Sequence, residues 1–133
     1  DKNYEVRYAI RPLDIIMKEY QESIKNKKEG ETILHPNKYC SPSLQATVLN
    51  ISGGQLPNIA QFDSEAVMNE FNADWGATTF VEVGEEFGQS YKYCVVVAIH
   101  KDDTGDAYIF FLSDTKVDFE KNMQTAFLSL RFK

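Results

Sequence analysis

The chain holds two cysteines and two histidines, and their spacing limits the chemistry that they could share. Cys94 and His100 lie six residues apart in an extended apolar run. At ~3.3 Å per residue, these two residues would be about 20 Å apart, too far for a direct hydrogen bond. His35 and Cys40 share one loop and could approach each other, but no third residue is placed to orient the histidine. Thiol catalysis is therefore disfavoured.

The carboxylates of the run Asp102–Asp106 resemble a cation-binding loop at first sight. A calcium loop of the EF-hand type needs glycine at its sixth position and glutamate at its twelfth. Counted from Asp102, these positions hold Ala107 and Ser113. Aspartate and glycine are also the residues that a tight hairpin turn requires, so the run predicts a turn.

No motif for a cofactor or metal is present. The glycine pair at 53–54 lacks the lysine of a phosphate-binding loop and the spacing of a dinucleotide fingerprint. Two histidines without clustered thiolates or carboxylates do not predict a zinc site. We therefore expect no cofactor and no metal. A disulfide between Cys40 and Cys94 stays open, because spacing alone does not test the geometry that a bridge requires.

Charge is distributed unevenly along the chain, whose net charge is −6. Residues 39–91 contain no lysine or arginine. The same segment contains these acids: Asp63, Glu65, Glu70, Asp74, Glu82, Glu85 and Glu86. No basic stripe exists for phosphate contacts, so we expect no nucleic-acid partner. The acids either keep the protein soluble or form a docking surface for a basic partner or a cation, and solvation is the more common role of such runs.

Two β-rich runs between Tyr91 and Ser113 flank the turn and predict a β-hairpin. Alternate residues are apolar on both sides of each run, whereas a strand with one wet face alternates apolar and polar residues. Both faces of this hairpin should therefore be covered, and the hairpin should lie in the middle of a sheet.

The remaining elements follow from periodicity and turn residues. In chain order we expect a strand over 4–10, a helix over 12–28, a strand over 44–51, a helix over 65–74, a strand over 78–83 and a last strand over 126–133. The first helix carries an apolar stripe of Leu13, Ile16, Met17, Tyr20 and Ile24, which we expect to pack on the sheet.

This element order predicts a single α+β domain over residues 1–133. Its mainly antiparallel sheet, flat or strongly curved, would pack on one long N-terminal helix and a second short helix. No apolar run reaches the ~20 residues of a membrane-spanning helix. The first residue is Asp1 rather than methionine, so the start is either processed or trimmed. Of the possible locations, an extracytoplasmic one (secreted or periplasmic) is favoured.

Three functions fit these observations. The first is a small soluble binding module without catalysis, holding a small-molecule or protein ligand in an aromatic pocket between sheet and helix. The expected ligand-binding residues are Tyr20, Trp75, Tyr93, His100 and Tyr108. The second is a small enzyme that uses His35 or His100 as a general base. The third is an acidic protein that binds a basic partner.

Overall fold

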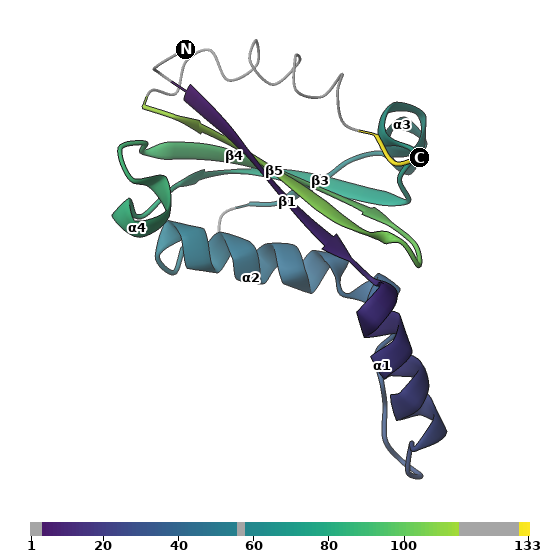
Figure 1. Cartoon of the computed structure of the whole chain (residues 1–133). Helices are drawn as coiled ribbons and strands as arrows, with labels where there is room; N and C mark the ends of the chain where they lie inside the picture. Colours follow the sequence, from purple (N-terminus) through teal and green to yellow (C-terminus); the bar gives the residue numbers. More distant parts are fainter. Residues whose placement is uncertain (1–3, 56–57, 115–130) are drawn as a thin grey trace.

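An antiparallel five-stranded sheet organises the molecule, as the computed structural model in Figure 1 shows. The structure describes residues 4–55, 58–114 and 131–133. The strands are β1 (Tyr4–Pro12), β2 (Ala60–Gln61), β3 (Trp75–Glu82), β4 (Tyr93–Lys101) and β5 (Gly105–Ser113). Their order across the sheet is β1-β5-β4-β3-β2, and every neighbouring pair is antiparallel. The prediction of an α+β fold with a mainly antiparallel sheet is confirmed.

The hairpin of β4 and β5 is the centre of this sheet, as its two-faced apolarity predicts. β1 flanks it on one side and β3 on the other. Cys94, Val96 and Ala98 belong to the core on one face, whereas Val95 and Val97 belong to the core on the other. The sheet is therefore the middle layer of the fold.

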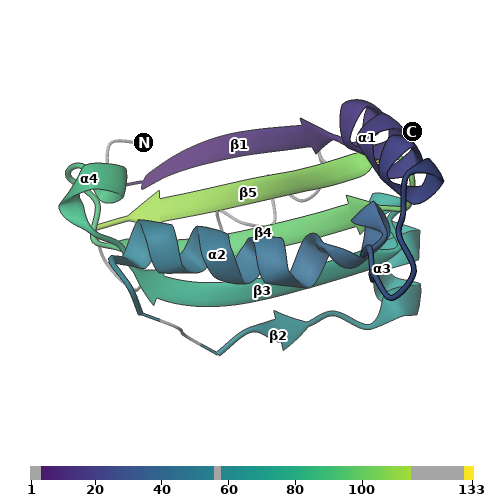
Figure 2. The same ribbon diagram turned by 90° about the horizontal axis from the view of Figure 1, so that it is seen from below.

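Helices pack on both faces of the sheet, and Figure 2 shows α2 (Cys40–Ser52) lying along one of them. On this face, Leu44, Val48 and Ile51 of α2 pack into the core. Helix α3 (Ser64–Phe71) contributes Val67 and Phe71 to the opposite core. We call the face of the sheet on which α2 packs the α2 face.

The strand expected over 44–51 is wrong, because this segment lies within α2. Leu44, Ala46 and Val48 alternate with polar residues and so imitate a strand. The buried residues are instead Leu44, Val48, Ile51 and Ser52, spaced as on one side of a helix. The helix ends where Gly53 adopts a left-handed conformation with φ of 74°.

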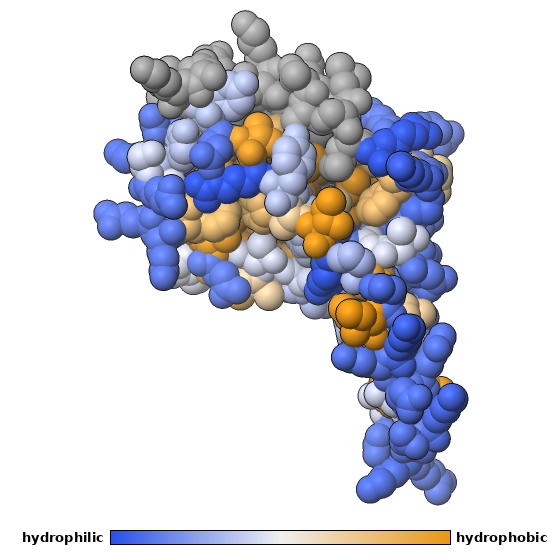
Figure 3. All heavy atoms as spheres, viewed as in Figure 1, coloured by the Kyte–Doolittle hydropathy of each residue, from blue (hydrophilic) through white to orange (hydrophobic). Residues whose placement is uncertain are grey.

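The long N-terminal helix packed on the sheet is not confirmed. Helix α1 (Asp14–Lys25) has 12 residues, none of them buried, and it projects away from the sheet (Figure 1). Its surface is largely hydrophilic in Figure 3. Pro12 ends β1 instead of starting the helix, and Leu13, which is fully buried, anchors the junction. The amphipathic stripe is real, but among the described residues only its first member, Leu13, is buried.

Two short helical segments complete the described structure: η1 (Pro36–Lys38) and α4 (Glu85–Gly88). The helix expected over 65–74 is present as α3, and the strand expected over 78–83 is present as β3. The strand expected over 126–133 falls mostly outside the described residues, and 131–133 are not in a strand. Within the described ranges, no helix is long and apolar enough to span a membrane.

Candidate functional site

A row of cross-strand neighbours crosses the α2 face at the turn end of the hairpin. The register places Trp75 of β3 opposite His100 of β4, His100 opposite Asp106 of β5, and Asp106 opposite Arg11 of β1. Directly opposed side chains of an antiparallel sheet lie close enough to interact. The row therefore brings a histidine, a carboxylate and a guanidinium into contact although they are far apart in sequence.

His100 is the centre of this row and is fully buried. Its Nδ1 lies 2.7 Å from Oδ1 of Asp106, and its Nε2 lies 3.0 Å from Oδ1 of Asp102. Burial by itself lowers the pKa of His100, but the hydrogen bonds and charges of Asp106 and Asp102 together outweigh it and raise the pKa. The arrangement favours an imidazolium that donates both of its N–H groups to carboxylates.

Asp106 joins the histidine to Arg11. Arg11 donates Nε to Oδ2 of Asp106 at 3.0 Å, and its Nη2 forms an ion pair with the same oxygen. Burial raises the pKa of Asp106, but the hydrogen bonds from His100 and Arg11 more than offset this and lower it. When His100 is protonated, the cluster with Asp102 included contains two cations and two carboxylates, and its charges balance.

The hairpin turn beside the cluster is fastened to other parts of the chain. The side-chain amide of Asn37 in η1 makes two hydrogen bonds with Asp103. Its Nδ2 donates to Oδ1 of Asp103 at 3.0 Å, and its Oδ1 accepts the main-chain N–H of Asp103 at 2.8 Å. The main-chain N–H of Leu13 donates to the carbonyl of Thr104, and that of Asp102 donates to the carboxylate of Asp74. The cluster therefore lies where the base of α1, η1 and the hairpin turn meet.

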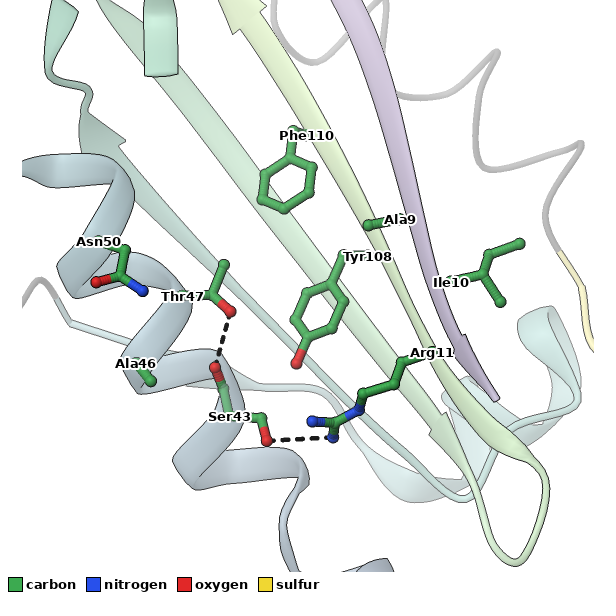
Figure 4. A pocket seen from close by; sticks show the side chains of 9 residues that line it. All are labelled: Ala9, Ile10, Arg11, Ser43, Ala46, Thr47, Asn50, Tyr108 and Phe110. Atoms are coloured by element: carbon green, nitrogen blue, oxygen red, sulfur yellow. Dashed lines mark hydrogen bonds between the residues drawn. The ribbon is translucent and has the colours of Figure 1, made fainter. Parts of the chain in front are cut away.

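An open cavity of about 380 Å³ lies next to the cluster, between α2 and the strands β1 and β5 (Figure 4). It is lined by Ala9, Ile10, Arg11, Ser43, Ala46, Thr47, Asn50, Tyr108 and Phe110. Small side chains create this space: Ala9 is the cross-strand neighbour of Tyr108, and Ala46 faces them from α2. Bulkier residues at these two positions would close it.

Apolar and polar groups are separated within the cavity. The rings of Tyr108 and Phe110 stack at a centroid distance of 6.2 Å and form an aromatic floor. At one end, Arg11 Nη2 donates to Ser43 Oγ at 3.2 Å, and the Thr47 hydroxyl donates to the Ser43 carbonyl at 2.9 Å. Burial, followed by the charge of Asp106, raises the pKa of Tyr108, so the phenol is neutral at physiological pH. The cavity thus offers aromatic faces, hydroxyl groups and one guanidinium.

Three of the expected ligand-binding residues lie on the α2 face. Tyr108 lines the cavity. His100 lies behind it in the buried cluster, and Trp75 is half-buried against the α2-face core. Only Tyr108 of these three is a lining residue.

The other two lie elsewhere. Tyr93 is stacked on Phe80, with ring centroids 5.9 Å apart, on the side of the sheet opposite α2. Tyr20 is on α1, where its ring meets that of His35 edge to face at 4.8 Å. The five residues are therefore not brought together into one pocket. His35 Nδ1 accepts the main-chain N–H of Asn37 and caps η1, and so has a structural role.

Both cysteines are free thiols, so the structure contains no bridge between them. Cys40 starts α2 and is half-buried, and burial is the main cause that raises its pKa. Cys94 is buried in β4, and burial raises its pKa to about 12. Neither thiol is prepared to act as a nucleophile near neutral pH.

The acids of 39–91 fall at two ends of the sheet. Asp63 and Glu70 lie on or beside α3, at the start of β3, whereas Glu82 and Glu86 lie at its end and in α4 (Figure 1). β3 has eight residues, which at ~3.3 Å each separates the two groups by about 23 Å. Exposed charges more than about 8 Å apart are largely screened from each other at physiological ionic strength, so the two groups of acids do not reinforce each other's field.

Sequence reasoning missed the residues that build the site: Arg11, Ser43, Thr47, Asn50, Asp102 and Asp106. The pattern at 102–106 predicts only a turn and gives neither aspartate a role in a site. The sequence of the hairpin could have identified Asp106. If the hairpin turns at Asp103, then His100 lies opposite Asp106. The contribution of α2 was hidden by its interpretation as a strand.

In the described part of the chain, no group of three or more histidine, cysteine or acidic side chains is placed to hold a metal ion. Comparison of the chain with protein families, with curated proteins and with solved structures found no match. The geometry of the cavity and of the cluster beside it is therefore the basis for a functional proposal.

Proposed function

We propose that the protein is a non-catalytic binding module whose ligand, a small molecule, occupies the cavity between α2, β1 and β5. The observation that carries this proposal is the open cavity of about 380 Å³ with an aromatic floor and hydrogen-bonding groups at one end. Ligand sites are commonly apolar hollows of about 300–1,000 Å³ with a few placed polar groups.

The ligand that suits this lining is neutral and amphipathic. The charge of Arg11 is balanced by Asp106, so the cavity has no strong preference for an anion. A flat apolar part of the ligand would lie on Tyr108 and Phe110. Its polar part would reach Ser43 and the exposed Asn50 side chain on α2.

The same geometry argues against the enzyme alternative with His100 as general base. A base needs a ring nitrogen that can accept a proton from substrate. Both nitrogens of His100 are held by carboxylates, and the ring is buried away from the cavity lining. We assign His100 a structural role, holding the turn against β1 through Asp106.

A library of neutral, ring-containing fragments tests the proposal by NMR titration of the labelled protein. We expect binders that shift the amide signals of Ala46, Thr47 and Asn50. The exposed Ala46 allows a cavity-filling variant, Ala46→Trp, which should abolish these shifts without disturbing the core. Gln45→Trp is the matched control, because Gln45 is exposed on the same helix but does not line the cavity.

Two results would contradict the proposal. One is a library without any fragment that shifts these amides. The other is a fragment whose binding survives Ala46→Trp and Gln45→Trp equally, because such a fragment would occupy a different site.

A further inference from the structure

Within the described residues, strand β1 has one unpaired edge. Among the described strands it pairs only with β5, and it is nine residues long, whereas β2 at the opposite edge has two. A long free edge presents main-chain N–H and C=O groups that another strand can pair with. Tyr8 and Ile10 of this strand are 53% and 72% exposed.

The sequence of β1 is complementary to itself when it runs antiparallel to a second copy with Tyr8 at the centre. Glu5 then lies opposite Arg11 of the second copy, and Val6 lies opposite Ile10. Within one copy Glu5 forms an ion pair with Arg7, and Arg11 forms one with Asp106. The contact between Glu5 and Arg11 therefore joins two existing ion pairs across the interface. Tyr8 lies opposite its own copy. Opposed ions of unlike charge and opposed apolar or aromatic residues both stabilise antiparallel pairs. The contacts of Glu5 with Arg11 and of Val6 with Ile10 each occur twice because of the two-fold symmetry.

Neighbouring registers lack this complementarity. Centring the pair on Arg7 places two arginines opposite each other, and centring it on Ala9 places Arg7 opposite Arg11. A parallel pair would place every charge opposite its own copy. Like charges directly opposite each other destabilise a pair. Centring on Val6 or Ile10 leaves five residues of each strand paired, so the Tyr8 register alone joins the full strand without a like-charge contact.

We propose that the protein forms a two-fold symmetric dimer in which the β1 strands of two copies pair antiparallel about Tyr8. The occupant of the free edge is thus a second copy of this chain, and the sheets of the two copies become one continuous sheet. The proposal goes beyond ligand binding and does not depend on it.

Helix α2 leaves room for this pairing. α2 packs on β3 and β4, two strands inward from the edge, and Figure 2 shows β1 at the margin of the sheet. In the space-filling view of Figure 3, apolar side chains reach the surface where β1 crosses the front of the molecule. In the dimer, both α2 helices lie on the same side of the joined sheet, because an antiparallel two-fold pair keeps equivalent faces together.

Sedimentation velocity of the 133-residue chain, from about 1 µM to about 1 mM, measures the association. We expect a species of twice the 15.2 kDa chain mass to grow with concentration. Tyr8→Lys and Tyr8→Glu each place like charges at the two-fold axis, and each should weaken the dimer at least about tenfold. An equimolar mixture of the two variants should dimerise again, because only this register makes position 8 face itself.

Met68→Lys is the matched control, since Met68 is 42% exposed on α3, away from β1, and should leave association unchanged. Circular dichroism checks that each variant is folded. A chain that stays monomeric at every concentration overturns the proposal and leaves the edge to another partner. A dimer that both single variants form normally, or that the mixture does not restore, overturns the register.

Discussion

Asp106 and Asp102, the two carboxylates hydrogen-bonded to His100, differ in burial. Removing each carboxylate should therefore lower the free energy of unfolding by a very different amount. The side chain of Asp106 is 4% exposed, whereas that of Asp102 is 56% exposed. Removing one partner of a buried ion pair costs about 3–5 kcal/mol, because the remaining charge is left uncompensated. An exposed ion pair contributes about 0–1 kcal/mol. We therefore expect Asp106→Asn to lower the free energy of unfolding by about 3–5 kcal/mol, and Asp102→Asn by less than about 1 kcal/mol.

The pH dependence of stability follows from the same groups. The pKa of His100 is raised in the folded state, so its contribution is fully present below about pH 6.5 and is lost as pH rises through the raised value. The pKa of Asp106 is lowered, so its contribution is present above about pH 3.9 and is lost as pH falls through the lowered value. Asp106→Asn should remove most of both dependences.

Urea unfolding at several pH values, followed by circular dichroism and by Trp75 fluorescence, measures both effects. Asp102→Asn is the matched control, because it removes a carboxylate from the same imidazole without emptying a buried position. Equal costs for the two substitutions would refute the reasoning, as would a cost of Asp106→Asn below about 1 kcal/mol. Either result would mean that the cluster does not hold the hairpin to β1.

Other substitutions test the layers of the fold. Val97→Asp buries an unpaired charge at a fully buried central position and should cost several kcal/mol, so a near-wild-type urea midpoint would contradict the three-layer arrangement. Leu13→Ala should cost about 2–5 kcal/mol, because Leu13 is fully buried, whereas Ile24→Ala on the projecting helix should cost less than about 0.5 kcal/mol. Comparable costs at these two positions would mean that α1 packs on the body. In thiol labelling of the native chain at pH 8, Cys94 should stay unreactive until urea unfolds the protein, and rapid native labelling at Cys94 would contradict its burial.

The central hairpin could be predicted from sequence because its apolar residues occupy both faces, a pattern that only a covered strand tolerates. The helical spacing of the apolar residues in α2 could not be recognised in the same way. Leu44, Ala46 and Val48 fit a spacing of two, and the helical spacing becomes visible only when Ile51 is included. A short amphipathic helix with small and polar residues therefore looks like a strand in a narrow window.

Sequence periodicity also predicts which side of a helix is apolar, but it does not predict which surface that side packs against. The stripe on α1 predicts burial, but only Leu13, just before the helix, is buried. The candidate site was not predicted either, because its residues are brought together by the pairing of strands that are distant in sequence. Arg11 and Asp106 are 95 residues apart and meet only because β1 pairs with β5, which no local pattern specifies. Tyr108 alone of the expected ligand-binding residues lines the cavity.

Intermolecular nuclear Overhauser effects between a bound fragment and the cavity test the central claim most directly. The account predicts contacts from the fragment's ring to the aromatic protons of Tyr108 and Phe110, and from its polar end to the Thr47 methyl group. The Ala46→Trp variant should show none of these contacts under the same conditions. Contacts that instead reach Phe80 or Tyr93, on the opposite side of the sheet, would contradict the assignment of this cavity as the ligand site.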